Sequence, residues 1–386
     1  MSLIRFLTAG ESHGESLTAI VDGVPAGLPI TASEINSDLA RRQEGHGRGG
    51  RMRIERDQVR ITAGVRGGRT IGSPLSLTIQ NRDWTNWTSR MAVEGAVDGP
   101  VVTAPRPGHA DLVGAMKFGR RDLRDVLERA SARETAARVA VGAVARILLR
   151  QFNVRILGHV ISIGGVRAVR FPGNWDARAR AAASSPVRCA DPAASRAMVR
   201  AIDRAIGMRD TLGGVVEVRA SGLVAGLGSY TQWDTRLGSR IAAAVMGIQA
   251  VKGVSIGDAF GVADLPGSRA HDEIFHSKGR GYFRRTNRAG GLEGGMTNGE
   301  ELCVQAAVKP ISTLMKPLRT VDIRTRKPVR AHIERSDACM VPAAAVVVEA
   351  ALAVELARAY QEKYGGDSIE EMRRNWRANA AYLRSF

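Results

Sequence analysis

The residues in this sequence that are best suited to chemistry are histidines and arginines placed in short turns. His13 stands between the glycines of residues 10–14, and His109 directly follows a Pro-Gly pair. Histidine is the side chain that exchanges protons most readily near neutral pH, and the Pro-Gly turn holds Arg106 and His109 in a constrained loop. We therefore predict acid–base residues in these two turns. For His13, a plain hairpin turn with a solvated histidine is the alternative.

A second candidate is a helix start flanked by arginines. Ser131 and Glu134 have the spacing of a capping box, so we expect a helix that begins near Ser131 and continues past Leu148. The N-terminus of a helix carries unpaired N–H groups and a partial positive charge. Because Arg129 and Arg133 lie on either side of it, this end is a candidate phosphate site. An ordinary N-capped core helix with solvated arginines is the alternative.

Turns rich in glycine and arginine occur elsewhere. In residues 44–53, glycines would let the backbone approach an anion while arginines supply forked donors. This segment lacks the Gly-Lys-Ser/Thr ending of a P-loop, and a basic disordered loop is the alternative. Residues 287–299, which are rich in glycine, and the donor-rich turn 309–313 are also segments in which the backbone can lie close to a ligand. Together with Asp337, the arginines at element ends predict a polyanion site and do not name a reaction. These arginines are Arg42, Arg48, Arg106, Arg129, Arg133 and Arg335.

The elements that must position these side chains follow from periodicity and capping. Strands are expected at 4–8, 17–21, 59–65, 75–79, 154–163, 213–222, 255–260 and 302–308. Helices are expected at 32–42, 192–206, 237–251 and 342–363, besides the one near residue 131 and a final helix capped by Asp367 and Glu370. Segments 83–105, 171–191 and 268–299 are expected to be loops. Because strict β-α-β alternation and a Gly-x-Gly-x-x-Gly motif are both missing, we predict one α+β domain over residues 1–386 and no Rossmann site.

Composition limits the class of protein. The chain has 386 residues, of which 44% are hydrophobic and 24% charged, which excludes wholesale disorder. The most apolar stretch, 341–356, is interrupted by Glu349 and Glu355, so no membrane span is expected. The beginning of the chain has no secretory-signal pattern, and three scattered cysteines fit a reducing cytoplasm. The histidines and carboxylates of 271–276 match no metal-ligand spacing, so no metal is expected.

The net charge of +18 raises the alternative of a basic protein that binds nucleic acid. Two features disfavour it. The arginines are spread along the chain, often with carboxylates three or four residues away, and aromatic residues make up only 5% and do not alternate with basic ones. We therefore favour an anionic small-molecule substrate and expect no nucleic-acid or membrane partner.

Six motifs in order resemble those of the chorismate synthase family, and the resemblance covers nearly the whole chain. Residues 10–14 with 21–25 resemble the first signature of that family, 129–136 the second, and 335–339 with Glu349 the third. Residues 106–111, 287–299 and 309–313 also match. One departure is Ala130, where many members have serine, although its backbone can still serve.

The resemblance implies a reaction and a cofactor. Members of the family convert 5-enolpyruvylshikimate 3-phosphate to chorismate and phosphate by a 1,4-anti elimination, the last common step of the shikimate pathway to aromatic amino acids. They are carbon–oxygen lyases that need reduced FMN although the net reaction is redox-neutral. NADPH is a candidate reductant, since some members reduce their own flavin. The implied fold is a single-domain β-α-β sandwich of antiparallel sheets with helices, and the implied assembly is a cytoplasmic homotetramer. A flavin-binding phosphosugar enzyme with different chemistry is a second alternative, besides the nucleic-acid-binding protein.

The resemblance also implies residue roles. His13 would protonate the departing phosphate, His109 would hold the reduced flavin in its correct protonation state, and Asp337 would lie near the flavin N5 and relay the hydrogen removed from the substrate ring. Candidates for holding the substrate are Arg42, Arg48, Arg106, Arg133 and Arg335. Candidates for contacting the flavin are Arg129, Ala130, Ser131, Gln249, Ala250, Gly294, Lys309, Pro310, Ile311, Ser312, Thr313 and Arg335.

Overall fold

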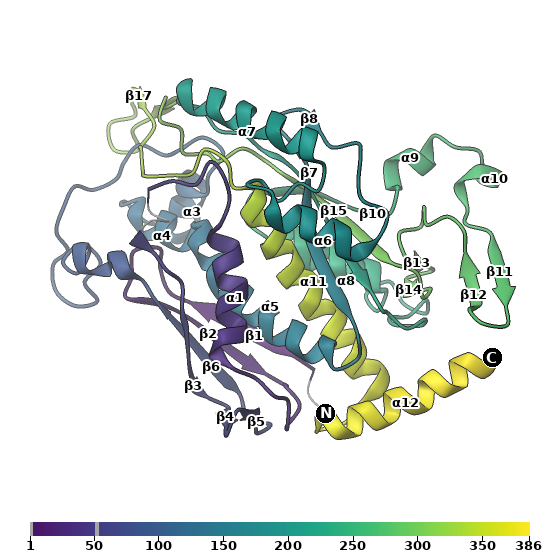
Figure 1. Ribbon diagram of the computed structural model, residues 1–386. Helices are drawn as coiled ribbons and strands as arrows, with labels where there is room; N and C mark the ends of the chain where they lie inside the picture. Colours follow the sequence, from purple (N-terminus) through teal and green to yellow (C-terminus); the bar gives the residue numbers. More distant parts are fainter. Residues whose placement is uncertain (1–2, 51–53) are drawn as a thin grey trace.

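A computed structural model describes residues 3–50 and 54–386, which form two antiparallel sheets with a layer of helices between them (Figure 1). The first sheet has the strand order β1-β2-β6-β3. Its strands are β1 (Arg5–Ala9), β2 (Ser16–Asp22), β3 (Val59–Ala63) and β6 (Leu75–Gln80). Leu17 pairs with Ile79 across β2 and β6, and both side chains are buried. The apolar alternation predicted for these strands therefore faces the helix layer.

The second sheet has the order β10-β15-β9-β7-β8. Its strands are β7 (Arg155–Ile163), β8 (Val166–Arg167), β9 (Gly214–Ser221), β10 (Val251–Ile256) and β15 (Leu302–Val308). β9 lies in the middle of this sheet and pairs along its length with β7 on one side and β15 on the other. This sheet supplies the loop that follows β15, which reaches the candidate site.

Four helices lie at the centre: α1 (Ala32–Gln43), α5 (Thr135–Arg150), α8 (Leu237–Met246) and α11 (Val341–Tyr364). α5 packs on β2 and β6 of the first sheet, α11 packs on β7 and β9 of the second, and the two helices pack on each other. A Cβ atom added at Gly142 would lie 2.3 Å from the Ala350 Cβ, so glycine permits this close helix–helix approach. The predicted sandwich with helices within is confirmed.

Smaller elements surround these layers. They are the 3₁₀ turns η1 (Arg82–Asn86) and η2 (Ala132–Glu134), the helices α3 (Asp111–Phe118), α4 (Arg124–Ala130), α6 (Trp175–Ser184), α7 (Pro192–Gly207), α9 (Ala259–Ala263), α10 (Gly267–Ala270) and α12 (Ile369–Ser385), and the short strands β4 (Val65–Arg66), β5 (Arg69–Thr70), β11 (Ile274–Ser277), β12 (Gly281–Arg284), β13 (Leu292–Glu293), β14 (Met296–Thr297), β16 (Arg319–Val321) and β17 (Pro328–Arg330). The β11–β12 hairpin projects away from the layers (Figure 1).

Capping patterns predicted the start of α1 correctly and placed the start of α12 one residue too early. The capping box of Thr31 and Glu34 is present at α1, with both reciprocal bonds formed. At α12 the expected caps Asp367 and Glu370 are wrong by one position: the Ser368 hydroxyl accepts from the Glu371 N–H at 3.2 Å. Ser368 is the residue with extended backbone angles, which is the conformation that an N-cap requires.

Three segments differ from the expectation. The connection 171–191 contains α6, because the Asn174 side chain caps a helix there. The strand expected at 255–260 is wrong: α8 ends early at Met246, a short turn follows, and β10 runs from Val251 to Ile256. The polar region 268–299 holds short hairpins rather than loop alone. Hydrophobic periodicity is weak in short elements, so tertiary pairing decided these cases.

The glycine-rich loop 44–53 is described only as far as residue 50, so Arg51, Met52 and Arg53 lie outside the described residues. In the described part of the chain, none of the helices is long and apolar enough to cross a membrane. Among those same residues, no cluster of His, Cys, Asp and Glu side chains is arranged to hold a metal ion.

Candidate active site

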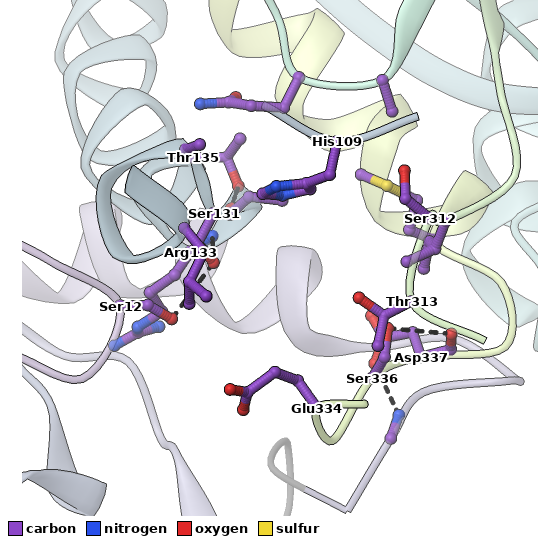
Figure 2. Close-up of a pocket in the computed structure, with 18 of the residues that line it drawn as sticks. Ser12, His109, Ser131, Arg133, Thr135, Ser312, Thr313, Glu334, Ser336 and Asp337 are labelled. Atoms are coloured by element: carbon purple, nitrogen blue, oxygen red, sulfur yellow. Dashed lines mark hydrogen bonds between the residues drawn. The ribbon is translucent and has the colours of Figure 1, made fainter. Parts of the chain in front are cut away.

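A cavity of about 350 Å³ opens where four segments meet: the turn of residues 10–14, the η2 turn, the loop after β15 and residues 334–337. Figure 2 shows Ser12, Ser131 and Arg133 on one side of it and Ser312, Thr313 and Asp337 on the other. Most of the residues predicted from sequence line this cavity: His13, Arg42, Arg48, Arg106, His109, Ala130, Ser131, Arg133, Gln249, Ala250, Lys309, Pro310, Ile311, Ser312, Thr313, Arg335 and Asp337. Arg129 and Gly294 are not among its lining residues.

The helix near Ser131 begins later than expected. Ser131 follows α4 and caps only the short turn η2, where its hydroxyl accepts from the Arg133 N–H at 3.3 Å. α5 starts at Thr135. The carboxylate of Glu134 does not complete a capping box; it accepts from Thr8, Arg138 and Gln249 instead.

The two arginines expected to flank the helix start have different surroundings. Arg129 turns toward β1, where its guanidinium donates to the Thr8 and Gly10 carbonyls. Arg133 turns toward the cavity and is buried. Arg129 and Arg133 therefore do not flank one anion site as predicted, and of the two only Arg133 lines the cavity.

Buried carboxylates hold two of the lining arginines. Arg42 contacts Asp57 at 3.1 Å, and Arg133 reaches the other oxygen of the same carboxylate. Arg42 also donates to the Thr135 hydroxyl at 3.0 Å. Burial lowers the pKa of Arg42, and the nearby charge of Arg133 lowers it further. The attraction of Asp57 acts in the opposite direction, and the resulting pKa is about 10. Arg42 stays charged at neutral pH, so both guanidiniums are fixed cations at the cavity wall.

His109 and Arg106 share one buried carboxylate. Arg106 Nε donates to Asp111 Oδ2 at 2.8 Å, and His109 Nδ1 is hydrogen-bonded to Asp111 Oδ1. A second guanidinium nitrogen of Arg106 donates to the Thr313 hydroxyl at 2.8 Å. Burial would raise the pKa of Asp111, but the bonds from His109 and Arg106 hold it well below its usual value. The ionised carboxylate therefore orients both side chains.

Asp337 lies across the cavity beside the glycine-rich loop. Arg48 Nη1 is 2.7 Å from its carboxylate, and the Gly49 N–H donates to the same carboxylate at 2.6 Å. A Cβ atom added at Gly49 would lie 2.6 Å from the Ser336 carbonyl oxygen, so the close approach requires glycine. The neighbouring Arg335 is more open, with 62% of its side chain exposed. The glycine-rich loop predicted as an anion site thus meets a carboxylate of the protein in this structure.

The loop after β15 contributes polar groups to the remaining wall. Lys309 Nζ contacts the Gly108 carbonyl, and Ser312 Oγ donates to the same oxygen at 2.9 Å. Burial and the nearby Lys252 lower the pKa of Lys309. Gln249 donates to Glu134 at 3.0 Å, while its own carbonyl Oε1 is buried and accepts no hydrogen bond among the described residues.

Comparisons with known proteins agree with this geometry. A family model described as chorismate synthase matches residues 4–361. The chain belongs to the chorismate synthase family. It is 54% identical to the chorismate synthase of Pelobacter propionicus, over 99% of this chain and 100% of that protein. It is 58% identical to the chorismate synthase of Moorella thermoacetica, over 99% of each. A crystal structure titled "Crystal Structure of Chorismate Synthase" superimposes with a TM-score of 0.81 at 41% identity and covers all of both chains.

The family assignment made from the six motifs is thus confirmed, and so is the fold that it implied. Sequence reasoning missed several residues around the site of this family member. Asp57 and Asn81 hold Arg133, and Thr135 holds Arg42. Asn81 and Asp57 stand in no motif that we used, so only their position in space reveals them. Ser12 and Thr135 lie inside the motifs 10–14 and 129–136, so the motifs themselves were the usable signal for these two residues.

Proposed function

We propose that this chain converts 5-enolpyruvylshikimate 3-phosphate to chorismate and phosphate by a 1,4-anti elimination in the presence of reduced FMN. The observation that carries the proposal is the charge of one cavity. Six cationic side chains line it against two carboxylates: Arg42, Arg48, Arg106, Arg133, Lys309 and Arg335 against Glu334 and Asp337. His13 and His109 line the same cavity. A substrate with one phosphate and two carboxylates matches that excess of positive charge.

All five arginines that the resemblance assigns to substrate binding line this cavity, which supports their proposed role. Arg42, Arg106 and Arg133 are buried and held by neighbouring groups, so their fork-shaped donors are in place before a ligand arrives. Arg48 is held by Asp337 at 2.7 Å, whereas Arg335 is the most exposed of the five, with 62% of its side chain open to solvent. Each guanidinium can contact a phosphate or carboxylate with two N–H groups.

The residues present also fit a flavin. The orphaned carbonyl of Gln249 is buried at the cavity and is an acceptor suited to a ring N–H. Reduced FMN would supply transient electron donation to the substrate. The groups that would hold it are the lining residues Ala130, Ser131, Gln249, Ala250, Lys309, Pro310, Ile311, Ser312, Thr313 and Arg335. Arg129 and Gly294 stay candidates from the family resemblance alone.

Three side chains would move or hold protons. We assign the protonation of the departing phosphate to His13, because a doubly charged phosphate is a poor leaving group and general-acid catalysis is worth roughly a hundredfold or more. His109, held by Asp111, would set the proton balance on the flavin side of the cavity. Asp337 would help to relay the hydrogen taken from the substrate ring, and Arg48 would orient its carboxylate.

The remaining expectations are part of the same proposal. One continuous buried core joins both sheets and the central helices, which supports a single domain over residues 1–386. We expect a cytoplasmic homotetramer, since that is the implied state of the family. NADPH stays a candidate reductant for the flavin.

The test is an anaerobic assay with chemically reduced FMN and 5-enolpyruvylshikimate 3-phosphate. We expect equal release of chorismate and phosphate, and neither product with oxidised flavin. FMN binding without either product would overturn the reaction and favour a flavin enzyme for another phosphosugar. Tight oligonucleotide binding that falls steeply with salt and survives removal of His13 and His109 would favour the nucleic-acid alternative.

A further inference from the structure

A buried carboxylate outside all six motifs of the site holds the turn that carries His13. Glu128, on α4, is only 2% exposed. Its backbone carbonyl accepts from the Ser12 N–H at 3.0 Å, and its Oε2 accepts from the His13 N–H at 2.8 Å. The Glu128 Oε1 lies 2.9 Å from Nδ1 of the His13 ring. One residue therefore positions both the backbone and the imidazole of His13.

An aromatic ring limits the imidazole from another direction. The ring of Trp87 stacks on that of His13, with the centroids 3.9 Å apart and the planes 21° from parallel. Trp87 is itself buried, and its indole N–H donates to Asp83 Oδ2 at 3.3 Å. Stacking leaves the ring little freedom to rotate, so the edge that faces Glu128 stays fixed.

The charges around this pair come from three elements. On α4, Arg124 donates to Glu128 at 3.0 Å, and its guanidinium also lies 2.9 Å from Glu334. Glu334 in turn contacts His332 at 2.8 Å. On η1, Asp83 pairs with Arg335. Among the described residues, the titratable groups that face the His13 turn include Glu11, Asp83, Arg124, Glu128, His332, Glu334 and Arg335.

We propose that Glu128 is a positioning residue for His13, which keeps a proton on Nδ1 and thereby makes Nε2 the atom that exchanges a proton with the substrate. The inference rests on the proposed function, in which His13 is the acid. A carboxylate bound to one ring nitrogen fixes the tautomer of a histidine and stabilises its protonated form. Burial would raise the pKa of Glu128, but the bonds from His13 and Arg124 hold it below the usual value, so this carboxylate is ionised at neutral pH.

The first test compares Glu128→Gln with Asp125→Asn. Gln has the shape of Glu without the charge. Asp125 lies on the same helix and pairs with the exposed Arg120, so its change to Asn removes a carboxylate without touching His13. In Glu128→Gln we expect kcat to fall roughly tenfold to a hundredfold while KM changes less than about threefold. The loss should be larger at about pH 9 than at about pH 6, because the neutral amide stabilises protonated His13 less.

A merely structural role would behave differently. It would lower kcat by the same factor at every pH, or lower FMN affinity and thermal stability together with kcat. Either result, or kcat values equal to those of Asp125→Asn, would overturn the proposal. Thermal unfolding and FMN titration of both variants identify a folding defect.

A second measurement does not depend on turnover. With nitrogen-15 in the histidine rings, NMR distinguishes a proton on Nδ1 from one on Nε2, and the signals of His13 are those lost in His13→Gln. We expect neutral His13 of the unsubstituted enzyme to carry its proton on Nδ1, and this preference to weaken in Glu128→Gln. A proton on Nε2 would overturn the positioning role. An enzyme that shows the Nδ1 proton but forms no chorismate would instead refute the proposed function and leave the positioning intact.

Discussion

Arg42, Arg48 and Arg133 each contact a carboxylate of the protein itself, either Asp57 or Asp337. Such pairing keeps long side chains in one conformation, so less side-chain entropy is lost when an anionic ligand binds. The partners differ in burial: Asp57 is buried, whereas Asp337 belongs to a more open loop. We therefore expect substitutions at the Asp57 side of the cavity to disturb the fold, and substitutions at the Arg48 side to act mainly on the ligand.

His13→Ala should lower kcat by roughly a hundredfold or more, because the phosphate would leave without a proton donor. Substrate binding, measured by titration in the absence of turnover, should persist, since the arginines are untouched. His276→Ala is the matched control, because His276 is exposed on the β11–β12 hairpin. Normal turnover in His13→Ala would remove this residue from the acid role.

Arg48→Ala should mainly raise the KM for the substrate, because it removes one of the guanidiniums that are proposed to contact the phosphate and carboxylates of the substrate. Loss of a hydrogen bond to a charged group costs about 1.5–3 kcal/mol, which corresponds to roughly a tenfold to hundredfold weaker apparent affinity. Arg60→Ala, on the exposed side of β3, is the control. An unchanged KM would show that the glycine-rich loop does not hold the substrate.

At the scale of elements, the site depends on how α5 and α11 pack. The N-terminal ends of both helices line the cavity, through Thr135 of α5 and through Ala343 and Val347 of α11. Glu349, inside α11, accepts from the Gly158 N–H of β7 and pairs with Arg41 of α1. The carboxylate thus ties the helix to both neighbouring layers. A shift of either helix would move cavity residues that are far apart in sequence.

Gly142→Ala should destabilise the protein, because its Cβ would overlap Ala350 on α11. Overpacking of this kind costs about 1–3 kcal/mol, measured as the free energy of unfolding in urea. Gly207→Ala, at the end of α7, is the control: apart from its own turn of helix and its chain neighbours, no atom of the described residues lies within 4 Å of the added Cβ. That variant should be as stable as the parent protein or slightly more so. Equal stability of both variants would contradict the packing argument.

At the scale of the whole molecule, the net charge of +18 coexists with many buried ion pairs. Carboxylates such as Glu128, Glu217 and Glu334 have pKa values below the usual one: burial would raise the pKa of each, but partner arginines and histidines outweigh that effect. The excess of arginine therefore serves structure as well as the cavity. The part of it that is spread over the exposed surface has no explanation in the structure.

Stability should fall in acid. Burial would raise the pKa of Glu334, but the hydrogen bond from His332 and the charge of Arg124 outweigh it and lower the pKa to about 2, from an ordinary value of 4.5. A depressed pKa contributes stability that is complete above the unfolded value and is lost as pH falls toward the folded value. We expect the free energy of unfolding in urea to decline from about pH 5 to about pH 2. In Glu334→Gln the decline should be shallower; an identical slope would mean that this carboxylate does not contribute.

The sequence by itself determined the family, the strands of the first sheet and the ends of α1 and β15, because motif order, alternation and capping are local properties. Residue types and their positions in turns also predicted that the arginines form one polyanion site, and the resemblance gave that site a reaction and assigned the residue roles. Tertiary structure decided the rest. Whether Ser131 starts a helix depended on the preceding α4, and the partners of Arg133 come from residues 57 and 81. Glu128 and Trp87 reach His13 from distant parts of the chain. Contacts of this kind depend on how the layers pack, and no local pattern in the chain records them.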